Sequence, residues 1–452
     1  MTVNPSIFRE YDIRGVADRD LTDALVINLG KALGTFVARK GGKSVALGYD
    51  CRLSSPRLRG VLARGLMATG LSVYDVGMVP TPVLYFATHH LMTDGGVMIT
   101  GSHNPGEHNG FKICVGPSTI HGDDIQALRK LIEKEDYDLR AGGTSENRPV
   151  EEDYISYIVR TVKVASPIRV VIDAGNGMGG KIAAALYREM GCEVVSLFEE
   201  YDGAFPNHHP DPTVLENLRS LIDTVCRQKA HVGIGFDGDA DRIGVVDASG
   251  RPLFGDELLV IFERDVLKNN PGAAIISEVK ASHRLFQDIE RHGGKAILWK
   301  TGHSLIKAKM KESGALLAGE MSGHMFFKDR YFGFDDAIYA GARIIEILSN
   351  TRKTAMELLA DLPPAVTTPE IRVDCADEIK FEVVQKARKR FETMGLNVNA
   401  IDGARVNFSD GWGLVRASNT QPVLVFRFEA ENEGRLLEIR SLVEGVVNSC
   451  LQ

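Results

Sequence analysis

The feature that most constrains the fold is a repeated alternation between short apolar runs rich in valine and isoleucine and amphipathic segments of helix length. The apolar runs lie at 45–47, 97–99, 169–172, 232–234 and 274–276. This alternation is typical of α/β folds, in which helices connect and cover the strands of a sheet. From about residue 370 the pattern changes to strand, charged helix and two further strands, which predicts a terminal α+β unit.

The length of the chain predicts several domains. Its 452 residues exceed the usual size of about 100 to 200 residues for one domain. The stretches AGGTSEN at 141–147 and DLPPAVTTPE at 361–370 indicate seams, and the turn ASGRP at 248–252 indicates a softer boundary. We therefore expect four domains, with the limits 1–147, 148–250, 251–362 and 363–452.

Composition and charge exclude several classes of partner. The net charge of -7 argues against nucleic acid, since a phosphate backbone requires a basic face. No run of about 18 apolar residues occurs, and the first residues lack the pattern of a signal peptide. We expect a cytoplasmic protein that does not bind membranes. The six cysteines form no CxxC pair, so they indicate reduced core residues rather than zinc ligands or disulfides.

A serine follows one of the apolar runs. The run GVMIT leads into GSHNP at 101–105, so Ser102 lies just past a predicted strand, where open α/β sheets present functional groups. Gly101 allows a tight turn at this point. Taken alone, Ser102 is more readily explained as the cap of a following helix.

Three aspartates follow the run VGIGF. In DGDADR at 237–242, Asp237, Asp239 and Asp241 alternate with glycine and alanine, so three carboxylates can converge on one ion. Hard oxygen ligands favour Mg²⁺ over zinc, and Arg242 adds a cation. The spacing of an EF-hand and its final glutamate are missing. An acidic surface turn is the simpler alternative.

A third polar loop, GEMSGH at 319–324, follows the apolar run ALLA. It offers the carboxylate of Glu320, the hydroxyl of Ser322 and the imidazole of His324, a set that suits sugar hydroxyls. A buried ion pair of Glu320 is the alternative.

A fourth loop, LVRASNTQP at 414–422, contains Arg416, Ser418, Asn419 and Thr420. These side chains and the backbone amides are donors for phosphate. An ordinary Asn/Thr turn is the alternative.

Together the four loops closely resemble those of the α-D-phosphohexomutase superfamily, specifically the bacterial phosphomannomutase/phosphoglucomutase group, and they occur in the family's order. The segments YDIRG at 11–15, GFK at 110–112, EVK at 278–280 and KTGHSLIK at 300–307 also look like family segments, so the resemblance covers the whole chain. Ala240 stands where the family commonly has glycine. The resemblance implies three similar α/β domains with mixed sheets and a C-terminal α+β domain, arranged around a central active-site cleft.

The resemblance also implies a function. The chain would interconvert hexose 1-phosphates and hexose 6-phosphates of mannose, glucose or both, through a phosphoserine at Ser102 and a hexose 1,6-bisphosphate intermediate. Mg²⁺ would be bound by Asp237, Asp239, Asp241 and a phosphoryl oxygen on Ser102. The only partners implied are small hexose phosphates, and we expect a monomer or weak oligomer.

The family further suggests roles for individual residues. Acid and base catalysis would fall to Arg14, Lys112 and His303, without an assignment of each. Glu320 and Ser322 would bind sugar hydroxyls. Phosphate binding and positive charge would come from Tyr11, Arg242, Lys280, His303, His324, Arg416, Ser418, Asn419 and Thr420.

Rival hypotheses come from other motifs. RVVID followed by Gly175, Gly177 and Gly180 matches the dinucleotide-binding fingerprint, which would predict a dehydrogenase. The run NHHPDP at 207–212 could be mistaken for a metal cluster. A phosphatase could use the same serine and metal. Phosphoglucosamine mutases usually have GEQSGH, and Met321 of this chain favours glucose and mannose instead. A non-catalytic relative would be expected to lack the serine or an aspartate.

Overall fold

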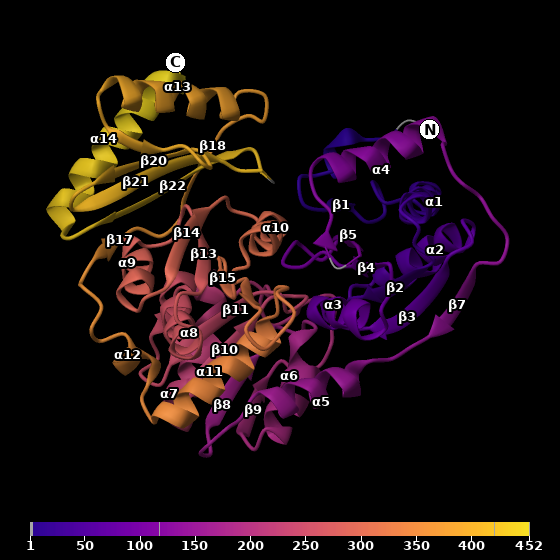
Figure 1. The fold of residues 1–452 in the computed structure, drawn as a ribbon, viewed down its shortest axis with the longest axis horizontal. Coiled ribbons are helices and arrows are strands. Elements are labelled where there is room, and N and C mark those ends of the chain that lie inside the picture. Colours follow the sequence, from indigo (N-terminus) through magenta and orange to yellow (C-terminus); the bar gives the residue numbers. More distant parts are fainter. Residues whose placement is uncertain (1–2, 117, 420, 452) are drawn as a thin grey trace.

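The structure is a computed structural model that describes residues 3–116, 118–419 and 421–451. Its four β-sheets follow one another along the chain. Figure 1 shows them around a common centre, with the first sheet on the right, the second below, the third on the left and the fourth at the upper left.

The first sheet is mixed and has the strand order β1-β5-β4-β2-β3-β7, with β6 beside β5. Its strands are β1 (Ile13–Val16), β2 (Ser44–Tyr49), β3 (Ser72–Met78), β4 (Gly95–Ile99), β5 (His108–Val115), β6 (Ser118–Thr119) and β7 (Thr144–Asn147). Its helices are α1 (Asp23–Arg39), α2 (Ser55–Met67), α3 (Thr81–His90) and α4 (Asp123–Lys134), after a short 3-10 helix η1 (Pro5–Ile7). β2, β3, β4 and β7 are parallel, whereas β5 is antiparallel to its neighbours β1 and β4.

The second sheet has the order β12-β11-β10-β8-β9. Its elements are α5 (Glu151–Thr161), β8 (Arg169–Asp173), α6 (Gly179–Glu189), β9 (Glu193–Leu197), η2 (Leu215–Leu218), α7 (Arg219–Gln228), β10 (Val232–Phe236), β11 (Ile243–Asp247) and β12 (Pro252–Leu253). β8, β9 and β10 are parallel, while β11 turns back antiparallel to β10.

The third sheet repeats this plan with the order β14-β13-β15-β16. Its elements are α8 (Gly255–Asn269), β13 (Ala274–Glu278), α9 (His283–Arg291), β14 (Lys295–Trp299), α10 (His303–Ser313), β15 (Leu317–Gly319), β16 (Met325–Phe327), α11 (Ala337–Thr351) and α12 (Ala355–Leu358). In both the second and third sheets a parallel strand is followed by one of the polar loops, 237–242 or 319–324, and then by an antiparallel strand.

The fourth sheet is entirely antiparallel and carries its helices after and between the strands. Its elements are β17 (Val366–Thr367), β18 (Ile371–Asp374), α13 (Lys380–Thr393), β19 (Asn397–Asn399), β20 (Ala404–Phe408), β21 (Gly411–Ala417), β22 (Val423–Ala430) and α14 (Glu433–Leu451). The predicted fold class, three mixed α/β units and a final α+β unit, is confirmed.

The hydrophobic cores do not correspond one to one with the four sheets. The first and fourth sheets have cores of their own, but one large cluster joins the second and third sheets and also includes α3 and parts of β2 and β4 from the first. α11 lies between them and contributes Ile338, Ile344 and Ile345 to that cluster. We conclude that the two middle units form one packed body, which the sequence did not indicate.

Several local expectations can be compared with the structure. All five predicted apolar runs lie within strands. Within the expected seam at 141–147, Thr144–Asn147 forms a strand that pairs with β3 in the first sheet. The cysteines are free, but Cys226 is exposed and Cys51 half-buried, so the expectation of core positions fails for these two. The four domain limits stay a prediction; β12, just after residue 250, pairs with β11.

Within the described part of the chain, no helix is both long and apolar enough to cross a bilayer.

Candidate active site

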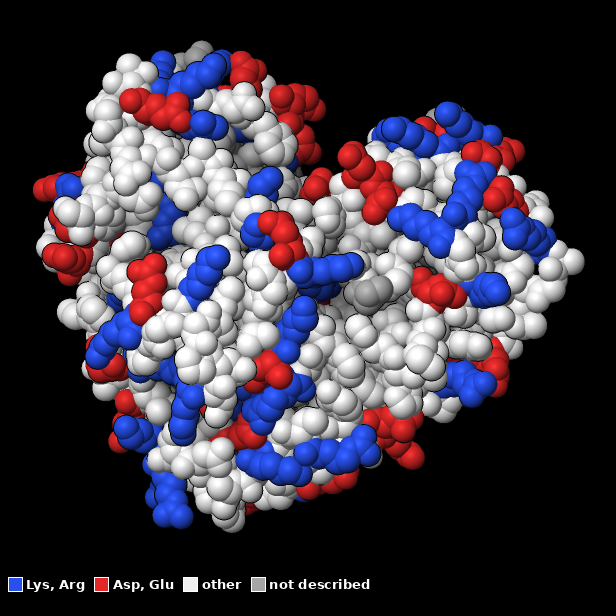
Figure 2. All heavy atoms as spheres, viewed as in Figure 1, with Lys and Arg blue, Asp and Glu red and all other residues white. Residues whose placement is uncertain are grey.

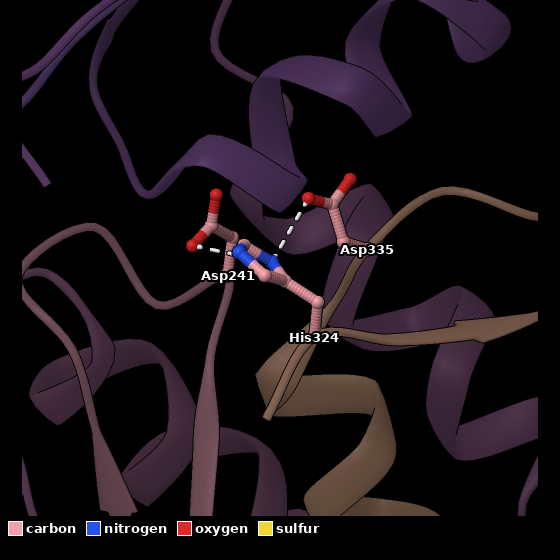
Figure 3. A group of neighbouring side chains, drawn as sticks. All are labelled: Asp241, His324 and Asp335. Carbon is pink, nitrogen blue, oxygen red and sulfur yellow. Dashed lines mark ion pairs between the residues drawn. The ribbon is translucent and has the colours of Figure 1, made fainter. Parts of the chain in front are cut away.

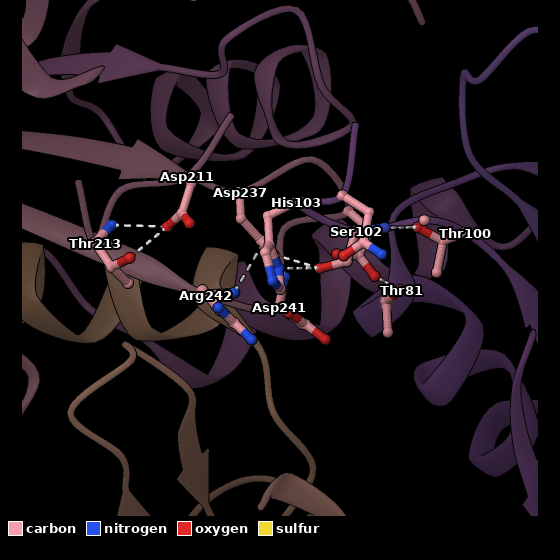
Figure 4. Close-up of polar contacts among 12 residues, drawn as sticks. Thr81, Thr100, Ser102, His103, Asp211, Thr213, Asp237, Asp241 and Arg242 are labelled. Carbon is pink, nitrogen blue, oxygen red and sulfur yellow. Dashed lines mark hydrogen bonds and ion pairs between the residues drawn. The ribbon is translucent and has the colours of Figure 1, made fainter. Parts of the chain in front are cut away.

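Ser102 lies in the loop that follows β4, beside the aspartate loop of the second sheet. Its Oγ donates to Asp237 Oδ2 at 2.8 Å and lies 3.1 Å from His103 Nδ1 (Figure 4). The residue is buried and has a positive φ of 49°, a conformation that costs a non-glycine residue free energy. The loop is held by Arg52, whose Nη2 donates to the Ser102 carbonyl at 2.8 Å. These contacts fix the serine hydroxyl against a carboxylate.

The aspartate loop follows β10 and brings three carboxylates together. Asp237, Asp239 and Asp241 are fully buried, and one oxygen from each lies within 4.8 Å of the others. Gly238 makes the approach to the serine loop possible, because a Cβ there would lie 2.3 Å from the Ser102 carbonyl oxygen. A side chain at this position would therefore push the two loops apart.

Positive charge balances this cluster only in part. Lys112 Nζ, from β5, lies 2.6 Å from Asp239 Oδ2 and also contacts Asp241. Burial and the two neighbouring carboxylates raise the pKa of Asp237 well above its usual value. Burial also disfavours the charged form of Asp241, but Lys112 and other cations outweigh it and lower the pKa of that carboxyl.

The aspartate loop fits a hard divalent cation. The Oδ1 atoms of Asp239 and Asp241 are buried and have no hydrogen-bond partner in the described chain. Orphaned carboxylate oxygens are costly in a protein interior unless a cation or donor meets them. Several carboxylates converging without sulfur or imidazole ligands form a donor set that suits Mg²⁺.

The third predicted loop, at 319–324, follows β15 and faces the aspartate loop. Glu320 is buried, accepts from the Gly302 amide at 2.7 Å and has a pKa raised by burial. His324 Nε2 accepts from Arg242 Nε at 3.0 Å, so the ring proton is on Nδ1. Ser322 lies half-buried in the same turn. Arg242 thus links the second and third sheets.

Asp335 was not predicted from the sequence, yet it lies at the centre of this group. Its Oδ2 is 3.1 Å from His324 Nδ1 and 3.5 Å from His303 Nδ1, and its Oδ1 accepts from Lys307 Nζ at 2.8 Å. Figure 3 shows Asp335 and Asp241 on either side of the His324 ring. Burial lowers the pKa of His303 well below its usual value, and Lys307 adds to this while Asp335 opposes it.

The fourth predicted loop, at 414–422, includes the end of β21 and contacts the first unit at Tyr11. Asn419 Nδ2 donates to Tyr11 Oη at 2.6 Å, and Tyr11 Oη donates to the Thr301 carbonyl at 2.9 Å. Arg416 is buried and pairs with Asp402 at 3.1 Å. The two contacts of Tyr11 join the first, third and fourth units at one place, and the Arg416 pair lies within the fourth unit.

Two members of the fourth loop need separate mention. Ser418 is buried, and its Oγ accepts from the Gln421 amide at 3.1 Å. Thr420, which was also predicted to bind phosphate, lies outside the described residues.

Arg14 and Lys280, two positively charged residues predicted for the site, each contact an acidic side chain. Arg14 donates to Asp12 at 2.6 Å and to Asn104, in the serine loop, at 2.9 Å. Lys280 is buried and pairs with Glu370 at 3.0 Å. Arg14 therefore lies at the serine loop, whereas Lys280 lies where the third unit meets the chain leading into the fourth.

Contacts connect the four predicted loops into one series. Ser102 contacts Asp237, whose Oδ1 accepts the Arg242 amide at 3.1 Å, and the Arg242 side chain contacts His324. The His324 ring stacks on His303 at 5.5 Å between centroids, and His303 meets Tyr11 edge-on at 5.9 Å. Figure 2 shows a notch between the first and fourth units, with both basic and acidic side chains at its foot.

His103 and Thr81 join Asp335 among the site residues that sequence reasoning missed. Thr81, the first residue of α3, donates to Asp239 Oδ2. His103 directly follows Ser102, and its position in the motif was a signal that could have been used. Thr81 and Asp335 follow no strand-and-glycine loop, so the sequence held no comparable signal for them.

The rival motifs have other roles in the structure. A Cβ at Gly177 would lie 2.8 Å from the Gly238 carbonyl oxygen, and the Met178 amide donates to that oxygen at 2.9 Å. The glycine-rich turn thus packs on the aspartate loop with its backbone. His208 pairs with Asp173 at 2.9 Å, and no potential metal group of the described residues includes it.

Comparisons with known proteins give one consistent result. Models of the phosphoglucomutase/phosphomannomutase family match in four parts: alpha/beta/alpha domain I at 5–138, domain II at 152–250, domain III at 254–366 and the C-terminal domain at 370–445. Together they match most of the chain in the order of the four sheets.

Relatives and solved structures match over nearly the full length. A phosphomannomutase/phosphoglucomutase of Pseudomonas putida is 49% identical, covering 97% of this chain and 94% of its own. A phosphoglucomutase of Neisseria gonorrhoeae is 46% identical over 99% and 98%. The crystal structure of a phosphoglucomutase/phosphomannomutase family protein from Burkholderia thailandensis is 43% identical over 99% and 98%, with a TM-score of 0.94.

Proposed function

The chain belongs to the phosphoglucomutase/phosphomannomutase family, and from this premise we propose that it is a phosphohexomutase that uses Ser102 as its phosphoryl carrier. It interconverts hexose 1-phosphates and hexose 6-phosphates and is an isomerase. The observation that supports the carrier role most is the Ser102 hydroxyl, 2.8 Å from one of three buried carboxylates that converge within 4.8 Å. The substrates proposed are the phosphates of mannose, glucose or both, a choice that Met321 favours over glucosamine.

Phosphorylated Ser102 starts the proposed cycle. A sugar hydroxyl, O6 of a 1-phosphate or O1 of a 6-phosphate, attacks the phosphorus, so that the new O–P bond forms as the bond to Ser102 Oγ breaks. The proton of the hydroxyl passes to a base, and an acid protonates Oγ. The resulting hexose 1,6-bisphosphate turns round and returns its other phosphoryl group to Ser102.

Asp237, Asp239 and Asp241 would bind Mg²⁺, together with an oxygen on Ser102. When bound, the ion supplies neutralisation of the charge on the transferring phosphoryl group. The orphaned Oδ1 atoms of Asp239 and Asp241 support this assignment. Lys112, whose Nζ contacts the same two carboxylates, brings a further positive charge to the phosphoryl group.

Proton transfer is proposed for Arg14, Lys112 and His303. Lys112 and Arg14 lie beside the serine and aspartate loops, and His303 faces them across His324. A base within hydrogen-bond reach of the sugar hydroxyl accelerates such a step by about 10²- to 10⁴-fold. Burial lowers the pKa of His303, which keeps its imidazole neutral and able to accept a proton.

Substrate binding is proposed for the loops that face the serine. Glu320 and Ser322 would bind the hydroxyls O3 and O4, which glucose and mannose share. Arg416, Ser418, Asn419 and Thr420 would bind the phosphate that is not reacting, and Tyr11, Arg242, Lys280 and His324 would complete the polar lining. The same expectations include a monomer or weak oligomer that acts in the cytoplasm and binds neither nucleic acid nor membranes.

The test is a coupled assay of glucose 1-phosphate and mannose 1-phosphate with the native enzyme, Ser102→Ala and the matched control Ser6→Ala, whose serine is exposed in η1. We expect near-complete loss only in Ser102→Ala, and phosphoserine at position 102 in the native enzyme. Retained activity in Ser102→Ala would refute the carrier role. Release of inorganic phosphate instead of an isomerised sugar would favour the phosphatase hypothesis.

A further inference from the structure

A polar cavity of about 100 Å³ lies between the third and fourth units and includes none of the proposed site residues. Its wall is formed by the first turn of α8 with the preceding Arg251, by Arg284 near the start of α9, by residues 365–367 and by Arg427 of β22. Figure 1 shows β17 and the chain leading to it beside α9. A single water needs only about 10–15 Å³ of such space, so an ion of several atoms fits.

The acidic groups of this cavity already have partners within the protein. Asp256 Oδ2 accepts from the Ser282 amide at 2.9 Å and from Arg427 at 3.2 Å, and its Oδ1 accepts from the Glu257 amide at 3.0 Å. Glu257 accepts from Arg251 at 2.8 Å and from the Phe254 amide at 3.3 Å. Every oxygen of the two carboxylates therefore already accepts at least one hydrogen bond.

The arginines, by contrast, have unused donors. Arg427 is 3% exposed, and its Nε has no hydrogen-bond partner in the described chain. Arg284 donates to the Ser282 hydroxyl at 3.2 Å and to the Pro363 carbonyl at 3.1 Å, and no carboxylate of the described residues pairs with it. A buried guanidinium with an orphaned donor calls for an acceptor.

We propose that this cavity is a binding site for a phosphate-sized oxyanion, separate from the Ser102 site. Guanidinium groups match the geometry of phosphate and bind it through paired hydrogen bonds. The three arginines outnumber the two carboxylates of the lining, and the start of α8 adds the partial positive charge of a helix N-terminus. The ligand is either the free ion or the phosphoryl end of a small metabolite.

Contacts with two backbone carbonyls connect the lining of the cavity to the proposed active site. Gly255, the first residue of α8, packs so closely on the third loop that a Cβ there would lie 2.2 Å from the Glu320 carbonyl oxygen. Arg427 Nη1 also donates to the Lys280 carbonyl. An anion between Arg284 and Arg427 would thus join the chain at 363–367 to the third unit, directly behind residues proposed to bind substrate.

The proposal is tested with inorganic phosphate on the full-length enzyme. Hydrogen–deuterium exchange of the peptide spanning 359–368 and equilibrium dialysis are compared for native protein, Arg284→Ala and the control Arg388→Ala, whose arginine is exposed on α13. We expect phosphate to slow exchange in this peptide for the native protein and the control. In Arg284→Ala the dissociation constant should rise about 10-fold or more, as expected for loss of a charge-assisted hydrogen bond.

The outcomes separate this site from the proposed reaction. Ser102→Ala should keep the protection of 359–368, so a failure of the carrier role leaves the test intact. Protection by glycerol phosphate as well as by phosphate would identify a phosphorylated metabolite, and protection by phosphate alone the free ion. Unchanged exchange, or equal protection in Arg284→Ala, would overturn the proposal. Arg251→Gln serves as the second variant should Arg284→Ala not fold.

Discussion

At the scale of single residues, Asp335 is the side chain whose role follows most directly from its contacts. Its carboxylate faces His303, His324 and Lys307, and a carboxylate that orients an imidazole sets both its tautomer and its charge. We expect Asp335→Asn to lower kcat on the order of 10- to 100-fold, the range lost when an orienting partner is removed.

A pH profile distinguishes orientation from simple loss of structure in that variant. Asp335 opposes the burial that lowers the pKa of His303, so its removal should lower this pKa further and move the acidic limb of kcat/KM to lower pH. Asp18→Asn, at an exposed position, is the control. An unshifted profile with a normal thermal transition would contradict the role.

The aspartate loop should show a conflict between stability and metal binding. Burial and two like charges raise the pKa of Asp237, which means that its ionised form destabilises the fold without a cation. We expect Asp237→Asn to unfold in EDTA at the same temperature as the native protein or higher. Mg²⁺ at 100 times its dissociation constant should stabilise the native protein by about 2.7 kcal/mol and leave the variant unchanged.

Calorimetric scans of both proteins with EDTA and with Mg²⁺ provide the measurement. An equal increase in Tm for the native protein and for Asp237→Asn would show that the ion binds elsewhere. Loss of mutase activity in EDTA with recovery in Mg²⁺ is the matching functional result.

At the scale of elements, a largely buried ion pair helps to hold the chain between α12 and β18. Glu370 lies 3.0 Å from Lys280, and this lysine, with burial acting against it, is the main cause that lowers the pKa of Glu370 to about 2. A lowered pKa means that the pair stabilises the fold fully above the ordinary value near 4.5, and that this contribution is lost as the pH falls toward 2.

Glu370→Gln should therefore unfold more easily at pH 7, by about 1–3 kcal/mol, because each pKa unit corresponds to about 1.4 kcal/mol and partial exposure screens the pair. The difference from the native protein should shrink as the pH falls below 4.5. Urea unfolding at pH 7, 5 and 4 measures this. The exposed pair of Glu382 and Lys386 is the control, and Glu382→Gln should change little.

The elements also show how far sequence patterns reach. Strand ends followed by glycine-containing loops predicted where Ser102, Asp237 and Glu320 would lie, because parallel strands present their carboxyl ends at one edge of a sheet. Arg416 was predicted from the donors of its own motif, and it lies within β21 of the antiparallel fourth sheet. β7 was missed, since the polar run TSEN lacks any apolar signal and is a strand only because β3 offers an unpaired edge. Asp335 was missed because the packing of α11, and no local motif, brings it to His324.

At the scale of the whole molecule, the sequence indicated the four units but could not show how they pack. Apolar periodicity reports which face of an element is buried and not which neighbour buries it. The shared core of the second and third sheets, with α11 between them, therefore appeared only in the structure. The first and fourth units have further cores of their own, but α3 of the first also packs into the shared core, and Trp412 of the fourth packs on Val279 of the third. Polar contacts such as those of Tyr11 add to these apolar ones.

Tyr11 should control how closely these outer units approach the centre. Its hydroxyl accepts from Asn419 of the fourth unit at 2.6 Å and donates to the Thr301 carbonyl of the third at 2.9 Å. Hydrogen bonds of this kind contribute about 1 kcal/mol each, enough to shift an equilibrium between open and closed arrangements several-fold. Tyr11→Phe should therefore give a larger radius of gyration in X-ray scattering without substrate. Tyr137→Phe, which alters a hydroxyl bonded within the first unit, should scatter like the native protein, and identical profiles for all three would show that this contact does not hold the units together.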